Sequence, residues 1–218
     1  MDVDVFSRTE TSDKIIGAST YNLVIGLTLI WGFAINWFMV QNISVESISN
    51  INPIVFFIGY FASCFFGIYL FRKSDSPLVS FIGYNFVVVP FGLIINLVVS
   101  QYNPDIVLEA IRVTGMVTFV MMLLGSMYPA FFNKIAGGLT IALFCVIVVE
   151  LIEIFIFNTH HGILDWIVAV IFCGYIGYDW ARANAIPKTY DNAVDSAAAL
   201  YMDIINLFIR ILRILGRK

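Results

Sequence analysis

Seven apolar stretches of about 20 residues each take up most of this 218-residue sequence, and short polar breaks separate them. A helix of about 20 residues is long enough to cross ~30 Å of hydrocarbon. Charged residues make up only 12% of the chain, whereas soluble domains carry roughly 25%. We therefore expect an all-α polytopic membrane protein that forms one transmembrane domain over residues 1–218. After an N-terminal tail (1–19), the predicted helices cover residues 20–40, 52–71, 78–100, 107–127, 135–157, 163–180 and 192–215.

Lysine and arginine are distributed unevenly over the breaks, and this asymmetry predicts the orientation. They occur in the N-terminal tail and in the second, fourth and sixth breaks. Short segments rich in these residues stay on the cytoplasmic side, so we expect a cytoplasmic N-terminus. The tail lacks the basic and apolar parts of a cleavable signal peptide, so the first helix should remain in the mature protein. The residues that carry the asymmetry are Arg8, Lys14, Arg72, Lys73, Lys134, Arg182 and Lys188.

The basic C-terminus conflicts with a count of seven spans. An odd number of spans places Arg210, Arg213, Arg217 and Lys218 on the outer side, against the positive-inside tendency. Either the last helix crosses and its arginines pair with acidic residues there, or it re-enters and returns to the cytoplasm. The length of the helix favours crossing.

Acidic side chains gather on the predicted outer side. Glu150 and Glu153 fall in the outer part of the fifth predicted helix, and Asp165 lies near the start of the sixth. Clustered charge beside low-dielectric walls raises the local concentration of counter-ions. These three residues are therefore candidates for a vestibule that attracts cations, and an ordinary wetted rim of the bundle is the alternative. Further acids on that side are Glu46, Asp105 and Glu109.

The last predicted helix carries one polar stripe on otherwise apolar sides. Its members recur at intervals of three and four residues, which places them on one face. Asp203 lies about eleven residues into the helix, hence ~16 Å from its start. A carboxylate at such a depth in a membrane indicates a functional site, although a structural ion pair with Arg210 is an alternative. The stripe consists of Asn192, Ser196, Ala199, Asp203, Asn206, Arg210 and Arg213.

Asp179 in the sixth predicted helix is the expected partner of Asp203. The midpoint between them is residue 191, close to the turn that joins the two helices, so both lie at similar depth in an antiparallel hairpin. Two carboxyl groups in a dry site cannot both ionise at low cost, so the pair is expected to share a proton and to sense pH near neutrality. A nearby cation would hold the deprotonated pair together. The candidates for this latch are Arg72 first, then Arg182 and Arg210.

The segment 191–216 resembles the C-terminal signature of the Bax-inhibitor-motif (TMBIM) family. It reads DNAVDSAAALYMDIINLFIRILRILG, and its LYMDIINLF core is specific. Tyr178-Asp179 is similar to the family's other conserved element, and Asp179 lies 24 residues before Asp203. The region from Arg72 to Gly83-Tyr84 resembles the family's junction between the second and third helices more loosely.

This resemblance, to a bacterial type of member, implies six helices around a central seventh and a pH-sensitive Ca²⁺ leak channel. Asp179 and Asp203 would be its sensor and gate, with Arg72 as the latch. Ca²⁺ would be the permeant ion, held transiently near the two aspartates, with no fixed metal site, no cofactor and no catalytic residue. The implied surroundings are a lipid bilayer and protons, without nucleic acid, in the plasma (inner) membrane of a bacterium. Glu150 and Glu153 belong to no motif of the family.

Two other classes of function fit parts of the sequence. Nothing in it excludes a non-transporting regulator that binds another membrane protein, such as a membrane protease. An intramembrane aspartyl protease would share Tyr178-Asp179 but needs Gly-x-Gly-Asp on the next helix, whereas Asp203 follows Ala-Leu-Tyr-Met. Ser126 lacks a nucleophile-loop context, and the adjacent His160 and His161 cannot present the i, i+4 spacing of a helical zinc site. We therefore expect that the protein is not an enzyme.

Overall fold

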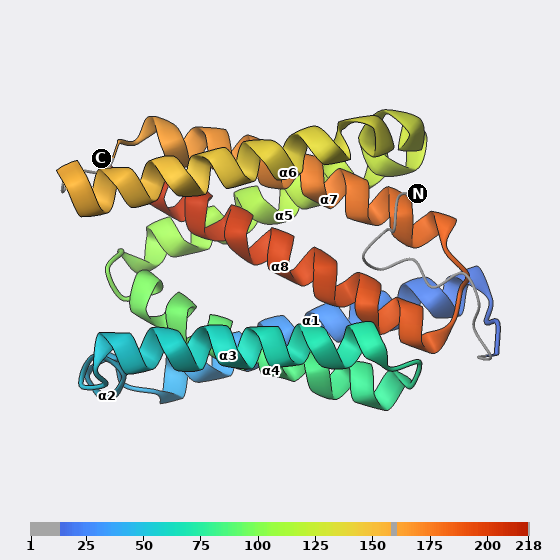
Figure 1. The fold of residues 1–218 in the computed structure, drawn as a ribbon, viewed down its shortest axis with the longest axis horizontal. Coiled ribbons are helices and arrows are strands. Elements are labelled where there is room, and N and C mark those ends of the chain that lie inside the picture. The colour runs from blue at the N-terminus through green and yellow to red at the C-terminus, as the bar shows by residue number, and fades with distance from the viewer. Residues whose placement is uncertain (1–13, 158–160, 218) are drawn as a thin grey trace. The chain divides into compact units, whose positions relative to one another are not determined.

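The computed structural model describes residues 14–157 and 161–217. Three residues named above, Arg8, His160 and Lys218, lie outside this range. Within it, the regular elements are all helical (Figure 1). They are α1 (Ala18–Asn42), α2 (Val45–Ser49), α3 (Pro53–Lys73), α4 (Pro77–Val99), α5 (Pro104–Met127), α6 (Pro129–Ile152), a π-helix (Glu153–Phe157), α7 (Ile163–Ala185) and α8 (Tyr190–Leu215).

Six helices are long and apolar enough to cross a membrane, judged by length and composition over the described residues. They are α1, α3, α4, α5, α6 and α7. The all-α polytopic membrane fold predicted from the apolar stretches is therefore confirmed. The last helix, α8, differs from these six because its 26 residues include several charged ones. The charged residues of α8 are Asp191, Asp195, Asp203, Arg210 and Arg213.

Proline determines where four of the long helices begin, which are α3, α4, α5 and α6. It suits the first helical position because its φ is already helical and its missing N–H needs no partner there. For this reason α5 begins at Pro104, before the predicted residue 107, and α6 begins at Pro129, before residue 135. At the other ends, α6 gives way to the π-helix, and α7 continues past residue 180 to Ala185. The short helix α2 lies within the first predicted break.

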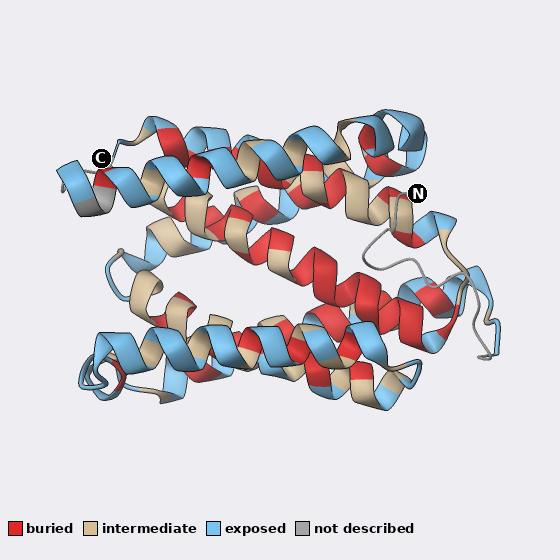
Figure 2. Ribbon diagram, viewed as in Figure 1, coloured by how far each residue is buried: buried red, intermediate tan, exposed pale blue. Residues whose placement is uncertain are grey.

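The chain divides into two compact units. The first contains the residues up to Gln101 together with Ala185–Tyr201, and the second contains Tyr102–Asn184 together with the chain from Met202 onward. Helix α8 therefore begins in the first unit and ends in the second. Its residues 191–200 are all buried, whereas α3, α5 and α6 expose more than half of theirs (Figure 2).

In the first unit, α3 and α4 pack closely because two glycines face each other. A Cβ atom on Gly67 would lie 2.4 Å from the carbonyl oxygen of Gly83, and one on Gly83 would lie 2.7 Å from that of Gly67. Small residues allow such close approach of helices in membrane proteins. Asn96 of α4 also holds the end of α1, since its side-chain amide donates to the carbonyl oxygens of Met39 (3.3 Å) and Ile43 (2.8 Å).

In the second unit, α7 is held against α5. A Cβ atom on Gly125 of α5 would lie 2.4 Å from the carbonyl oxygen of Gly177 of α7. A side-chain hydrogen bond also joins these two helices, because Nε1 of Trp180 on α7 donates to Oγ of Ser126 on α5 at 2.8 Å. Asp179 lies between Gly177 and Trp180 in the sequence, so it sits on a stretch of α7 whose position is fixed.

Large apolar side chains cover the exposed faces of α3 and α6. Phe57, Phe61 and Phe65 of α3 are 51%, 52% and 67% exposed, and Phe144 of α6 is 68% exposed. Extensive exposed apolar surface of this kind is unusual in a soluble monomer. It fits helices whose outer faces contact lipid, where backbone polar groups are already paired within each helix.

Candidate functional site

Asp179 of α7 and Asp203 of α8 are brought together within the second unit. Their carboxyl groups lie close enough to interact directly. Asp203 is 7% exposed, and its Oδ2 atom is buried without a hydrogen-bond partner in the described chain. The hairpin spacing predicted this proximity, and the roles of the two residues as sensor and gate stay predictions. The arrangement therefore places two acidic side chains next to each other where α8 is buried.

A tyrosine of α7 lies near the pair. Tyr175 lies one turn before Asp179 on α7 and is close enough to feel the charge of both aspartates. Its hydroxyl group donates to Oγ1 of Thr140 on α6 at 3.1 Å. Two adjacent carboxyl groups are costly to ionise together when water does not surround them.

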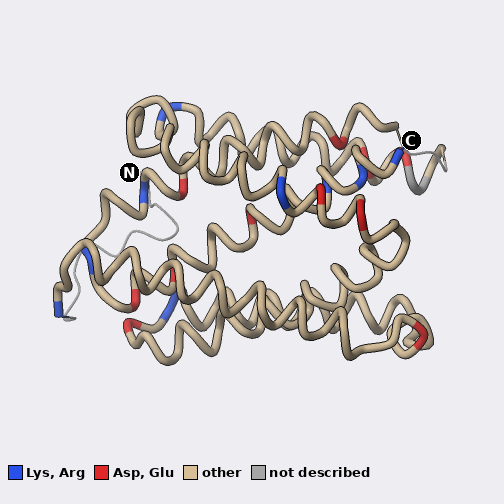
Figure 3. Tube along the Cα trace, turned by 180° about the vertical axis from the view of Figure 1, so that it is seen from behind, with Lys and Arg blue, Asp and Glu red and all other residues tan. Residues whose placement is uncertain are grey.

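A cluster of ion pairs joins α6, α7 and the C-terminal segment that includes α8. Figure 3 shows basic and acidic positions of the trace near the C-terminus. The guanidinium group of Arg210 donates to both oxygens of Glu150, with Nη2 at 3.0 Å from Oε2. It also donates to Oδ1 of Asp165 at 2.9 Å. Arg217 donates to Oδ2 of Asp165, and Arg213 lies 3.7 Å from Oδ1. Asp165 is fully buried, so its charge is balanced by arginines within the protein.

The cluster bears on two expectations from the sequence. Two of the three proposed vestibule acids, Glu150 and Asp165, are directed at arginines of the C-terminal segment. The third, Glu153, is in the π-helix and is 9% exposed. Its carboxylate accepts from the main-chain N–H of His161 at 3.1 Å and contacts Nδ1 of the same histidine at 2.7 Å. The C-terminal arginines thus pair with acids, and the crossing of the membrane by α8 stays a prediction.

The three candidate latch residues lie in different places. Arg72 is exposed in the last turn of α3, in the first unit. Arg182 is half-buried in the last turn of α7, three residues after Asp179. Arg210 is engaged by Glu150 and Asp165. The latch role of Arg72 stays a prediction.

The polar stripe of α8 is divided between the two units. Asn192 and Ser196 are buried in the first unit, where the hydroxyl group of Tyr21 contacts Oγ of Ser196 at 3.0 Å and donates to the carbonyl oxygen of Asn192 at 3.3 Å. Asn206 lies in the second unit and donates to the carbonyl oxygen of Met202 at 2.8 Å. The first half of the stripe therefore binds α8 to α1.

Several buried polar side chains of the first unit were missed by the sequence analysis. The hydroxyl group of Tyr84 donates to the carbonyl oxygen of Thr28 at 3.1 Å, and Asn36 donates to the hydroxyl group of Tyr201. Oγ of Ser80 donates to Oδ1 of Asp191 at 2.6 Å. Tyrosine, asparagine and serine inside apolar stretches were the available signal, but their partners come from distant helices.

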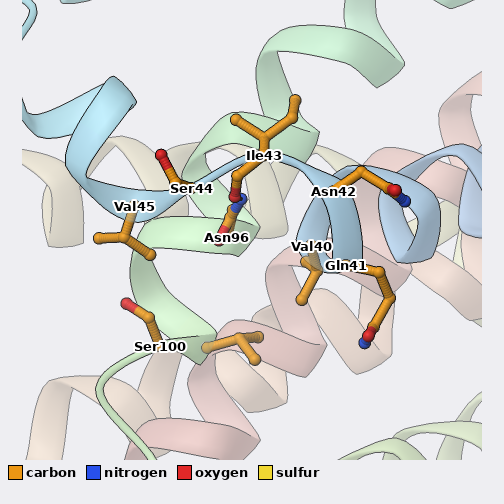
Figure 4. A pocket seen from close by; sticks show the side chains of 9 residues that line it. Val40, Gln41, Asn42, Ile43, Ser44, Val45, Asn96 and Ser100 are labelled. Atoms are coloured by element: carbon orange, nitrogen blue, oxygen red, sulfur yellow. The ribbon is translucent and has the colours of Figure 1, made fainter.

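A cavity of about 430 Å³ lies in the first unit, where α1 and α4 end. No ionisable side chain lines it. Figure 4 shows Asn96 in the middle of the lining residues, with Val45 and Ser100 on one side and Val40 and Gln41 on the other. This cavity contains neither of the two paired aspartates, so it is separate from the candidate site.

Comparison with known proteins places this architecture in a family. The sequence profile of the family described as inhibitor of apoptosis-promoting Bax1 matches residues 14–218. The chain belongs to the Bax inhibitor family. An uncharacterized protein of Helicobacter pylori is 30% identical over 166 residues, which cover 74% of this chain and 70% of that protein.

Eukaryotic proteins of related sequence match over a shorter length. Bax inhibitor 1 of Schizosaccharomyces pombe is 32% identical over 130 residues, which cover 57% of this chain and 47% of that protein. Protein LIFEGUARD 3 of Arabidopsis thaliana is 32% identical over 130 residues, covering 57% of this chain and 52% of that protein. The family predicted from residues 191–216 is confirmed, and its profile match includes α7 and α8 with the aspartate pair.

Proposed function

We propose that this member of the Bax inhibitor family is a pH-sensitive leak channel for Ca²⁺ or a similar cation, gated by Asp179 and Asp203. The observation that carries the proposal is the proximity of the two carboxyl groups, with Asp203 buried. Buried carboxylates in membrane helices are costly and mark ion or proton pathways more often than they serve stability. The family membership supports the same assignment.

Protonation of the pair is the proposed control. With one shared proton, the pair carries a single negative charge and α7 stays against α8. Loss of that proton leaves two negative charges in contact, which repel by about 4 kcal/mol at 4 Å and an effective dielectric constant of 20. Repulsion then separates the helices or draws a cation between them.

Ca²⁺ suits the deprotonated pair because it binds oxygen ligands and prefers carboxylates. The buried Oδ2 atom of Asp203, which has no hydrogen-bond partner among the described residues, offers one such ligand. Ca²⁺ takes about six to eight oxygens, however, and two aspartates supply only some of them. Passage with transient binding is therefore proposed, rather than a resident metal ion.

The proposed channel has seven spans, with α8 as the central one, in the plasma (inner) membrane of a bacterium and with a cytoplasmic N-terminus. The burial of α8 residues 191–200 supports a central position. Polar side chains lower the mean hydropathy of α8. They are tolerated in a central helix because such a helix contacts neighbouring helices instead of lipid. Arg72 is the proposed latch, and Glu153 is a proposed vestibule acid.

Flux through reconstituted protein tests this function. Purified protein in liposomes with a trapped Ca²⁺-sensitive dye should admit Ca²⁺ at a rate that changes across a pH series. Asp203→Asn should lose most of that pH dependence, because it removes the shared ionisable pair. Asp105→Asn is the matched control, since Asp105 is exposed in the first turn of α5 and the change in charge is the same.

The same experiment separates the channel from the alternative function. Folded wild-type protein that admits no more Ca²⁺ than empty liposomes at any pH would contradict a channel. The family member would then be better described as a regulator that acts by binding another membrane protein.

A further inference from the structure

One contact of the ion-pair cluster, between Asp165 and Arg217, follows the same alignment of α7 against α8 as the aspartate pair. Residue 191 is the midpoint between Asp179 and Asp203, and it is also the midpoint between Asp165 and Arg217. Both pairs are in contact. Asp165 and Asp179 are 14 residues apart, which is nearly four turns or ~21 Å, so they return to almost the same side of α7. One hairpin register therefore produces both contacts.

The far end of this register is fixed more firmly than the end at the aspartates. Asp165 of α7 is fully buried and contacts Arg210 and Arg217. Arg210 is only 15% exposed in its side chain and also binds both oxygens of Glu150 of α6. Three helices are thus joined at one guanidinium group, whose planar fork accepts only a narrow range of geometries.

We infer that Glu150, Asp165 and Arg210 form a register lock that holds α8 at the height and rotation where Asp203 meets Asp179. A slip of one residue along α8 would turn its side chains by about 100° and move them by about 1.5 Å. Such a slip would leave the carboxylates of Glu150 and Asp165 without their guanidinium partner. Buried charged groups are best known for this use, the selection of one register over its neighbours.

Arg210 acts on the pair through the helix and not by direct contact. It lies seven residues after Asp203, which is ~10.5 Å along the axis and on nearly the same face. Its guanidinium group is directed at Glu150 and Asp165. Arg210 is therefore a positioning residue. The link to gating rests on the proposed function, whereas the effect of the lock on the contact between residues 179 and 203 does not.

Cross-linking between α7 and α8 tests the register without measuring flux. In full-length protein with Cys64, Cys145 and Cys173 replaced by alanine, Asp179→Cys and Asp203→Cys place two thiols at the site. A short bifunctional thiol reagent should join them quickly in membranes. Adding Arg210→Gln should slow the reaction by about tenfold or more, because the lost partner leaves buried carboxylates that favour other registers. Arg210→Lys should restore part of the rate, since it keeps the charge without the fork.

Two controls separate the lock from a general loosening. Arg112→Gln makes the same change of charge at an exposed pair with Glu109 on α5, and it should leave the rate unchanged. A second thiol pair, made by Ser126→Cys and Trp180→Cys, reports the contact between α5 and α7. That pair should react equally fast with and without Arg210→Gln, because it does not involve α8.

The inference is overturned if Arg210→Gln leaves the reaction between positions 179 and 203 at its original rate. An equal loss of rate at positions 126 and 180 would also overturn it, since the whole unit would then have loosened. If Arg210→Gln does not fold, the combined Arg210→Gln and Glu150→Gln variant removes both charges and supplies the same comparison. These outcomes are independent of whether the wild-type protein conducts Ca²⁺.

Discussion

The carboxyl group of Asp203 on α8 lies next to that of Asp179 on α7. Asp179 lies fewer than two turns before the end of α7 and Asp203 more than three turns after the start of α8, yet they meet because the helices are antiparallel. A pair in direct contact shares its proton and titrates as one unit. This relationship gives the first prediction.

Asp179→Asn and Asp203→Asn should each remove most of the pH dependence of flux, and the double variant should add little to either. The effects of two substitutions are not additive when both residues take part in one interaction, because either substitution alone removes it. The measurement is the pH profile of Ca²⁺ entry into liposomes for the wild type, both single variants and the double variant. Independent shifts that sum in the double variant would show that the aspartates do not act as one site.

Arg72→Ala should raise flux at alkaline pH if Arg72 is the latch, because the deprotonated pair would lose a compensating positive charge. Lys73→Ala is the matched control. Lys73 is the next residue in the last turn of α3, it is also exposed, and its Nζ atom contacts the hydroxyl group of Tyr69 at 3.2 Å. Equal effects of the two variants would point to surface charge in general and remove Arg72 from the mechanism.

Thiol labelling should determine the orientation. In protein without its native cysteines, Glu46→Cys should react with an impermeant thiol reagent added outside cells, and Asp75→Cys should not. Both positions are exposed in the structure, so a difference in labelling reports the side of the membrane and not burial. The reverse pattern would place the N-terminus outside and move the acidic residues of the vestibule to the cytoplasm.

Glu153→Gln should lower flux at limiting Ca²⁺ and leave its pH midpoint unchanged, because a vestibule charge raises local cation concentration without joining the gate. Glu150→Gln is a separate case, since Glu150 is bound by Arg210 and belongs to the register lock. The measurement is initial flux over a Ca²⁺ series at fixed pH. Unchanged flux in Glu153→Gln at every Ca²⁺ concentration would leave this residue a structural partner of His161.

Gly125→Ala should destabilise the second unit by about 1–3 kcal/mol, the usual cost of overpacking. The added methyl group would lie 2.4 Å from the carbonyl oxygen of Gly177, so α5 and α7 would have to move apart. Gly115→Ala on the same helix is the control, because nothing lies within 4 Å of its added carbon. Thermal unfolding in detergent measures both, and equal melting temperatures would contradict the close packing.

Sequence reasoning reached the aspartate pair because the pair depends on local rules. Apolar stretches and breaks located α7 and α8, and helix geometry converted the distances from residue 191 into depth. The same rules failed at the edges of helices, where the prolines at positions 104 and 129 moved the starts of α5 and α6. They also did not assign Glu150 and Asp165 to particular arginines, because three arginines lie within two turns of one another.

The sequence by itself determined that the chain is a helical membrane protein of the Bax inhibitor family with two facing aspartates. Length, hydropathy and hairpin symmetry are properties of contiguous residues, and they need no knowledge of packing. Only the tertiary structure decided which charged residues form ion pairs with one another. Arg210 binds Glu150 and Asp165, and Asp165 also binds Arg217. The physical reason is that a buried ion pair needs three helices at fixed height and rotation, and those relations are not encoded in any single segment.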